Sequence, residues 1–356
     1  MSESSIAQRI ALHKEYWERR PVAFPPASFR CGDFFIARHF SAARPLLVPG
    51  KRITPEMLDV DAFLGDYERM FGELEKVGQS AFWTAEPYTG IPWMEAILGC
   101  AVYAGDAAFT AEPWMESLDQ IETLRFDPDG PWAKKYLEFT SKLVALSNGR
   151  FPVGQPIMRG PTDMIGTVMG QAEMVFALVD QPVAMHRFVE RVTEIFLDVI
   201  AAQRRLVPLF HGGSAIGFYH LWAPGPSIWF QDDLAAILSP EIYRDFFIPA
   251  AERICAGYDY TLVHLHPQSF FVVDDLLKIE RLKVIEVNRD VGGLTIQEMM
   301  PTLRKILSHK NLVVWGDYSE DDLDYIRSEL RVEGLFLNVI ARSTTDADRL
   351  ARHIEQ

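Results

Sequence analysis

Cysteine is scarce in this 356-residue sequence: the chain has three, an odd number, at positions 31, 100 and 255. That number and spacing exclude a disulfide framework and a metal knuckle built from paired cysteines. Long hydrophobic runs are also absent, because no apolar stretch approaches the roughly 18 residues that span a bilayer, and the charged N-terminal segment lacks the apolar core of an export signal. We therefore expect a cytoplasmic protein without a membrane partner.

Positive charge is in deficit, since 35 Lys and Arg residues are outnumbered by 49 Asp and Glu residues and the net charge is −14. A chain of this charge is repelled by a phosphate backbone, so nucleic acid is not an expected partner. The sequence also lacks the common glycine-rich phosphate loops, the GxSxG nucleophile elbow and the HExxH zinc motif. These absences argue against ATP hydrolysis, dinucleotide redox chemistry and serine hydrolysis, and a small molecule is the expected substrate.

Short apolar runs alternate with longer amphipathic segments along the chain, a pattern typical of an α/β fold with a mostly parallel sheet. We count eight such runs, which predicts a (β/α)8 TIM barrel with catalytic groups at the C-terminal ends of its strands. The predicted strands are residues 21–24, 81–86, 151–157, 215–221, 261–266, 283–288, 312–317 and 334–338. We expect one domain over residues 1–356, in which residues 1–75 form an N-terminal helical extension and the first strand and residues 76–356 form the remainder of the barrel.

Two histidines stand out in the fifth predicted strand. Side chains alternate between the two faces of a strand, so His264 and His266 share one face with Leu262 and point into the barrel. Two imidazoles on one face of a strand otherwise made of Leu and Val predict a metal pair or an acid/base pair, and two satisfied core imidazoles are the alternative. We therefore treat both as candidate catalytic and metal-binding residues.

Other predicted strands also end in polar or ionisable residues on the inner face. Buried charges are costly unless they are paired or functional, so this pattern predicts a polar mouth above an apolar barrel floor, although strands also end in polar residues simply because they reach the surface. Capping of a helix is an alternative role for Asp232. The further candidates are Glu86 and Asp317 for catalysis; His220, Glu286 and Asp232 for metal binding; and Arg30, Arg159, Arg342, Trp83, Phe218, Trp222, Asn288 and Asn338 for substrate binding.

Over residues 75 to 350 the sequence resembles the superfamily of uroporphyrinogen decarboxylase and the cobalamin-dependent methyltransferases. The resemblance rests on GPTD at 160–163, SPEIY at 239–243 with Phe246 and Pro249, VHLH at 263–266 and GLFLN at 334–338. It implies a (β/α)8 barrel of the uroporphyrinogen decarboxylase-like type with its site in the C-terminal mouth. It also implies a homodimer, because barrels of this superfamily often pair.

The chain departs from both halves of that superfamily. The arginine-rich element of uroporphyrinogen decarboxylase is replaced by PPASFRCGDFF, which offers Arg30 alone. The zinc methyltransferases carry His-x-Cys on a barrel strand and a later Cys; here His264 matches the His, His266 replaces the first Cys, and no later Cys lies near Asn338. The resemblance therefore implies a zinc ion or another divalent metal held by imidazoles and carboxylates, which is a harder donor set than one with thiolates.

The leading hypothesis is methyl transfer between a small substrate and a corrinoid, thiol or folate acceptor. No corrinoid-binding DxHxxG motif occurs in the sequence, so a corrinoid would arrive on a partner protein. Decarboxylation of a porphyrinogen or another carboxylated compound is the second hypothesis. A non-catalytic tetrapyrrole or corrinoid carrier and a metal-dependent hydrolase are further alternatives.

Overall fold

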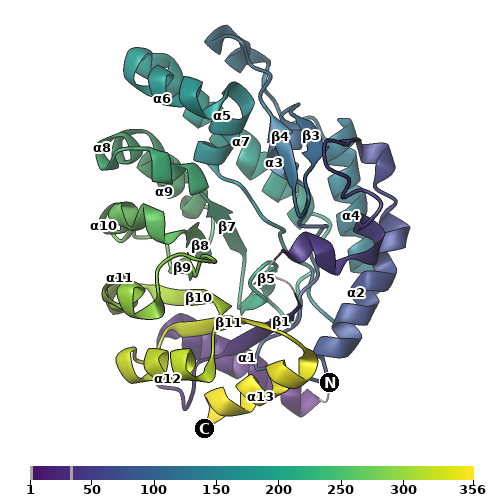
Figure 1. Ribbon diagram of the computed structural model, residues 1–356, viewed down its shortest axis with the longest axis vertical. Coiled ribbons are helices and arrows are strands. Elements are labelled where there is room, and N and C mark those ends of the chain that lie inside the picture. The colour runs from purple at the N-terminus through teal and green to yellow at the C-terminus, as the bar shows by residue number, and fades with distance from the viewer. Residues whose placement is uncertain (1–2, 33–34) are drawn as a thin grey trace.

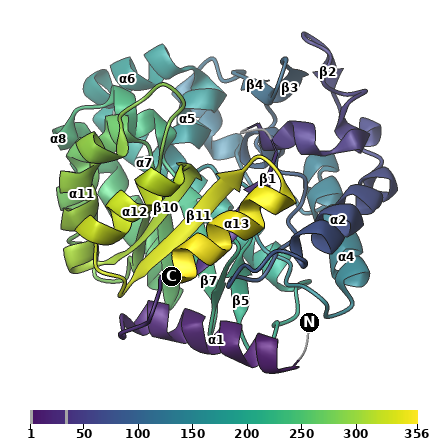
Figure 2. The same cartoon turned by 60° about the horizontal axis from the view of Figure 1, so that its bottom comes forward.

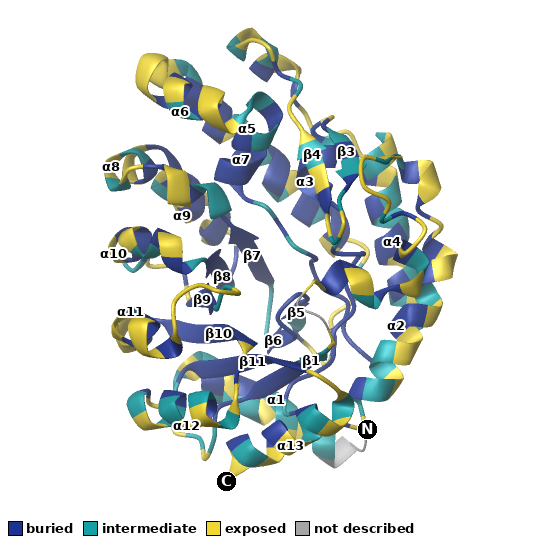
Figure 3. Cartoon of the chain, in the orientation of Figure 1, coloured by how far each residue is buried: buried dark blue, intermediate teal, exposed yellow. Residues whose placement is uncertain are grey.

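The computed structural model describes residues 3–32 and 35–356, and its central feature is a curled sheet of six parallel strands with helices around it (Figure 1). In space the strands follow the order β1, β11, β10, β9, β8, β7. Their bounds are Ala27–Cys31 (β1), Ser227–Gln231 (β7), Tyr260–Leu265 (β8), Val284–Asn288 (β9), Asn311–Asp317 (β10) and Leu335–Ala341 (β11). Nearly all of their residues are buried (Figure 3), as expected for parallel strands covered on both faces. The fold is therefore an α/β barrel-like fold.

Helices follow the strands and cover the outer face of the sheet. Two of them begin at capping boxes, in which the side chains of Thr295 and Ser319 accept a hydrogen bond from the backbone of the first turn. The helices in this half are α7 Pro182–Arg204, α8 Pro240–Ile242, α9 Ile248–Ala256, α10 Val273–Leu276, α11 Ile296–His309, α12 Glu320–Glu329 and α13 Thr344–Glu355.

Two extended segments, residues 81–86 and 151–159, lie between β1 and β7 in place of regular strands. Ala81 donates a backbone hydrogen bond to Ala27, and single parallel bridges join Ala85 to Val153 and Arg159 to Gln231. Proline has no N–H to donate, so prolines at 152 and 156 interrupt any continuous ladder along the second segment. The two predicted strands are therefore extended chain, and a regular eight-stranded barrel is not shown.

Two further strand predictions were wrong. The first strand is β1 and not residues 21–24. Residues 215–221 form most of a short antiparallel hairpin, β5 Ser214–Ile216 and β6 Leu221–Ala223, and the parallel strand of this region is β7. All five residues of β7 are buried, so the alternation that identifies a half-exposed strand is missing there. The last four predicted strands were confirmed to within three residues at each end.

The N-terminal helix α1 Glu3–Glu18 lies across the end of the sheet at which the strands begin (Figure 2). Asn311, the first residue of β10, donates a side-chain hydrogen bond to the carbonyl of Tyr16, and the Trp17 indole donates to the carbonyl of Trp222. The opposite end, where the strands finish, is left to the connecting loops. No helix in residues 3–32 and 35–356 has the length and apolar character needed to cross a bilayer.

A small antiparallel sheet lies beside the C-terminal ends of the strands. Its members are β2 Arg52–Ile53, β3 Ala101–Ala104 and β4 Phe109–Glu112, in the order β2, β3, β4. The helices of this side are α2 Val60–Leu74, α3 Trp93–Ile97, α4 Pro131–Ser147, α5 Pro161–Met169 and α6 Gln171–Asp180. The turn between β3 and β4 reaches the mouth of the barrel, where Ala107 and Ala108 line a cavity.

Candidate metal centre

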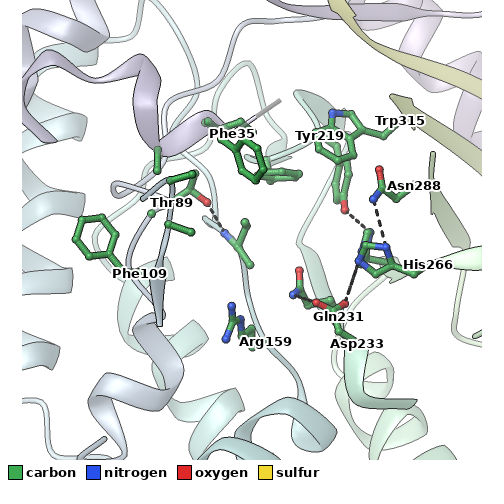
Figure 4. Close-up of a pocket in the computed structure, with 18 residues that line it drawn as sticks. Phe35, Thr89, Phe109, Arg159, Tyr219, Gln231, Asp233, His266, Asn288 and Trp315 are labelled. Atoms are coloured by element: carbon green, nitrogen blue, oxygen red, sulfur yellow. Dashed lines mark hydrogen bonds and ion pairs between the residues drawn. The ribbon is translucent and has the colours of Figure 1, made fainter. Parts of the chain in front are cut away.

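A cavity of about 250 Å³ lies at the C-terminal ends of β7, β8 and β9 (Figure 4). Its lining combines apolar side chains with polar and charged ones. The apolar lining includes Phe35, Ile157, Phe109, Phe218 and Trp315, and the polar lining includes Thr89, Arg159, Tyr219, Gln231, Asp233, His264, His266 and Asn288. This is the usual composition of a small-molecule site, in which a few polar groups orient a ligand against apolar side chains.

Three of the lining side chains converge on one point. The Nε2 atoms of His264 and His266 lie 3.6 Å and 3.7 Å from Oδ1 of Asp233, and the two imidazole centroids are 4.7 Å apart. Two ligands of a tetrahedral zinc ion lie about 3.4 Å apart when each is about 2.1 Å from the metal. Among the described residues these three form the one group of His, Cys, Asp or Glu side chains with such spacing.

The other ring nitrogen of each histidine is bound to a carboxylate. Nδ1 of His264 donates to Glu286, and Nδ1 of His266 donates to Oδ1 of Asp290 at 2.6 Å. The Tyr219 hydroxyl donates to Oε2 of Glu286 at 2.9 Å, and Nδ2 of Asn288 donates to Asp290 at 2.7 Å. These bonds leave Nε2 of each ring directed at the cavity, where it offers a lone pair once it is deprotonated, and this is how metal-binding histidines are oriented in proteins.

The carboxylates also set the electrostatics of the pair. Burial disfavours the charged form of His264, but the negative charge and hydrogen bond of Glu286 outweigh burial and raise the pKa of the imidazole to about 8. Burial alone would raise the pKa of Asp290, but the hydrogen bond and positive charge of His266, the hydrogen bond of Gln268 and the charge of His264 together outweigh burial and lower that pKa. A region with this excess of negative charge favours a cation between the ring nitrogens.

Asp233 sits at the start of the short turn η5 Asp233–Ile237, directly after β7. Its Oδ2 accepts a hydrogen bond from Nε2 of Gln231 at 2.8 Å, whereas its Oδ1 is buried and has no hydrogen-bond partner. The backbone of the turn is held by Asp163, whose two oxygens accept from the N–H groups of Asp233 and Leu234 at 3.2 Å and 2.8 Å. Oδ1 of Asp233, which faces the Nε2 atoms of both histidines, is therefore fixed in place. Two imidazole nitrogens and one carboxylate oxygen are a set of ligands that fits a divalent ion.

The structure brings together part of the residue set that the sequence singled out. His264 and His266 are side by side and face the cavity, as strand parity predicts. Arg159, Phe218 and Asn288 also line the cavity, so they are placed where a substrate would contact them. Their functional roles stay predictions.

The three other predicted metal ligands need correction. Asp232 points away from the histidines: its oxygens accept hydrogen bonds from Thr162 and Tyr243, and burial raises its pKa to about 7 although these bonds oppose the rise. His220 is buried outside this cluster, and burial lowers its pKa well below the ordinary value. Glu286 contacts His264 through Nδ1, so it orients a ligand rather than serving as one.

Several predicted catalytic and substrate-binding residues lie outside the cavity lining. Glu86 and Arg30 form a buried ion pair of 3.3 Å. Asp317 is exposed and lies with Arg342 in a separate surface depression near α12 and α13. The remaining three are buried structural groups: Trp83 packs edge to face against Phe151, Trp222 donates to the carbonyl of Phe210, and Asn338 donates to the carbonyl of Tyr219.

Asp233, Tyr219 and Asp290 are site residues that sequence reasoning missed. The signal for Asp233 was present, because Trp229, Gln231 and Asp233 have the same parity along β7 and Gln231 pairs with His264 in the sheet. That signal was not used, because residues 227–231 are not among the strands predicted from the sequence. Asp290 lies beyond the end of β9, where strand parity no longer applies.

Comparisons with known proteins support the fold. Over 97% of its length the chain is similar to 98% of the solved structure of a methyltransferase from Methanosarcina mazei, with a TM-score of 0.64 and 13% sequence identity. At this identity the likeness shows the fold alone. A homocysteine methyltransferase, MmuM from Escherichia coli, matches 49% of this chain and 75% of its own with 12% identity and a TM-score of 0.25, which is too low to carry an argument. No protein-family model and no curated protein sequence matches the chain.

Proposed function

We propose that this protein is a metal-dependent methyltransferase whose metal, zinc, is held by Asp233, His264 and His266. The observation that carries the proposal is the convergence of two Nε2 lone pairs and one buried, unpartnered carboxylate oxygen at the cavity. Two imidazoles and a carboxylate are a common ligand set for catalytic zinc, which keeps a position open for substrate. The fold shared with a methyltransferase over almost the whole chain supports methyl transfer as the reaction class.

A bound divalent ion would act as a Lewis acid that lowers the pKa of a thiol, hydroxyl or water at its open position. The protein's own residues would orient the metal ligands and exclude water. Glu286 and Asp290 keep the ring protons on Nδ1, and Asp163 holds the turn that carries Asp233. Phe218 and Trp315 exclude water from one side of the cavity.

The size of the cavity bears on the partner. A volume of about 250 Å³ suits a small molecule and is below the usual range for larger ligands. We therefore propose that a corrinoid, as methyl donor or acceptor, is presented by a separate protein at the mouth. The porphyrinogen form of the decarboxylase hypothesis loses support, because a porphyrinogen is too large for a cavity of about 250 Å³ and Arg30, which is engaged by Glu86, does not line it. A homodimer stays a prediction.

Metal content tests the proposal, and two neighbouring aspartates provide a matched pair of variants. Asp233→Asn removes a proposed ligand, whereas Asp232→Asn makes the same chemical change at a buried carboxylate that points away. We expect the purified wild type to take up about one zinc ion per chain, Asp233→Asn to lose it, and Asp232→Asn to retain it. Thermal melting shows whether each variant is folded. A folded wild type that binds no zinc, or loss of zinc in Asp232→Asn alone, contradicts the metal centre.

Methyl transfer itself is tested with methylcobalamin and a panel of small thiols and phenols. The methyl group leaves cobalt as a methyl cation equivalent, the acceptor loses a proton, and cob(I)alamin remains, so the absorbance change reports turnover. We expect zinc-loaded wild type to accelerate the reaction and Asp233→Asn to be inactive. Zinc binding without any methyl transfer across the panel would retain the metal centre and reject the proposed reaction.

A further inference from the structure

Arg159 is the one lysine or arginine among the described residues that line the cavity. About a third of its side chain, 33%, is exposed, whereas the carboxylate that it contacts is fully buried. Figure 4 places its guanidinium on the same side of the cavity as Gln231 and Asp233. A fixed positive charge in a small, mostly apolar cavity is a strong determinant of which ligands enter.

The backbone around Arg159 is rigid. Arg159 is bridged to Gln231, the N–H of Gln231 donates to the carbonyl of Met158 at 3.0 Å, and the N–H of Gly160 donates to the carbonyl of Gln231 at 2.6 Å. No Cβ fits at Gly160, because it would lie 2.7 Å from both the Gln231 carbonyl and Asp232. The stem of Arg159 is therefore tied to β7, the strand that leads directly to Asp233.

The guanidinium is only partly satisfied by the protein. Nη1 donates to Oε1 of Glu95 on α3 at 3.0 Å, and this is the single hydrogen bond of the side chain within the described residues. Glu95 is buried, and its Oε2 has no hydrogen-bond partner. A guanidinium carries several N–H donors in a planar fork that matches a carboxylate. One side of the fork is thus anchored by Glu95, and the remaining donors of this cavity-lining residue have no hydrogen-bond partner among the described residues.

The apolar part of the lining around Phe218 and Trp315 suits a flat apolar body. The Phe218 ring stacks on Trp229, with centroids 5.7 Å apart and an interplanar angle of 24°, and it contacts Trp315 at 5.6 Å. Ile157 continues the apolar lining toward Arg159 along the same segment. Phe218 and Trp315 are almost completely buried, with 5% of each residue exposed, so they present rigid surfaces to the cavity. Such walls favour an unsaturated or aromatic skeleton over a strongly hydrated one.

We propose that Arg159 is a specificity-determining residue that binds the carboxylate of a small, largely apolar organic acid, and that this acid is the substrate class of the site. The carboxylate pairs with the open side of the guanidinium fork and the body lies against Phe218 and Trp315. The inference rests on the proposed function in one respect. With its carboxylate bound to Arg159, the acid would direct the group that gives or receives the methyl toward the proposed metal site of Asp233, His264 and His266.

Binding of matched acid and amide pairs tests this inference. The probes are benzoate with benzamide and 4-methoxybenzoate with 4-methoxybenzamide, titrated into zinc-loaded and into chelator-treated protein. We expect wild type to prefer each acid, and Arg159→Gln to weaken acid binding by about tenfold or more while amide binding changes little. Arg159→Lys should retain part of the preference, since a point charge replaces the planar fork.

Loss of Arg159 leaves Glu95 buried without its partner, so Arg159→Gln is also made together with Glu95→Gln, which keeps the pair uncharged and similar in size. Wild type without acid preference for either pair, or an equal loss of acid and amide binding in both variants, overturns the inference. Zinc content is measured on the same samples. An acid preference that depends on Arg159 in a protein without a zinc site supports the carboxylate site and rejects the proposed function.

Discussion

Glu86 gives a prediction about stability that is independent of the metal centre. Its carboxyl group is 6% exposed, and burial raises its pKa to about 7 although the positive charge and hydrogen bond of Arg30 pull it down. The unfolded chain has an ordinary value of 4.5 for this group. The folded protein therefore holds a proton between these two pH values that the unfolded chain releases, and stability must fall as pH rises through this interval.

The magnitude follows from the shift. One pKa unit corresponds to about 1.4 kcal/mol, so a rise from 4.5 to about 7 lowers the free energy of unfolding by about 3 kcal/mol between pH 4.5 and pH 8. The loss is complete once the pH is above the folded pKa, and it is absent below pH 4.5. Glu86→Gln removes this titration and keeps an oxygen that can accept the hydrogen bond of Arg30.

The assay is urea unfolding of wild type and Glu86→Gln at half-unit steps from pH 5 to pH 8.5. The difference between the two proteins cancels the other titrating groups, and we expect it to shift in favour of the variant by about 3 kcal/mol across this range. Glu68→Gln is the control, because Arg150 lowers the pKa of this largely exposed carboxylate and its titration lies below the tested range. Parallel curves for wild type and Glu86→Gln would refute the reasoning.

Three further outcomes are expected. Asp163→Ala frees the two N–H groups that fix the Asp233 turn, so zinc affinity, measured by competition with a chromophoric chelator, should fall about 10- to 100-fold, and unchanged affinity would contradict this positioning role. Removing zinc from protein equilibrated at about 100 times its dissociation constant should cost about 2.7 kcal/mol of stability by calorimetry, and Asp233→Asn should show no such loss. Gly154→Ala places a Cβ 2.5 Å from the Gly217 nitrogen and should lower the free energy of unfolding by about 2 kcal/mol or more in urea unfolding. Gly149→Ala is the comparison: its Cβ has open space, so only the strain of a positive φ should lower the free energy of unfolding there, and the loss should be smaller.

The second half of the chain was predictable because each strand there is followed by a helix with its own start signal. The capping residues Thr295 and Ser319 mark where α11 and α12 begin, and the strands before them are short apolar runs. The first half was harder. Its strand positions contain prolines and glycines, and β7 is buried on both faces, so neither alternation nor propensity distinguishes strand from loop.

In the candidate site, too, residues on regular strands were predictable and residues in the turns after strands were not. Parity along β8 and the extended residue that follows it placed His264 and His266 together, since the period of two is fixed by backbone geometry. Strand ends were a poorer guide: Asp317 ends β10 but is exposed, and Asp232 differs from Asp233 by one position and points to Tyr243. Which of two adjacent carboxylates faces a cavity depends on the turn after the strand, and that turn is set by a long-range contact with Asp163.

The geometry around Asp233 favours a metal pair over an acid/base pair. Both Nδ1 atoms are already bound to carboxylates, so Nε2 is the free position on each ring. From Nε2 to Oδ1 the distances are 3.6 Å and 3.7 Å, which is too long for the hydrogen bonds that an imidazolium would make with Asp233. When both rings are deprotonated at Nε2, as metal binding requires, three acceptors face one another and Oδ1 has no hydrogen-bond partner, which is unfavourable for a buried oxygen. A cation between the two Nε2 atoms and Oδ1 would be bound by all three acceptors, whereas a proton can be shared by two of them at most.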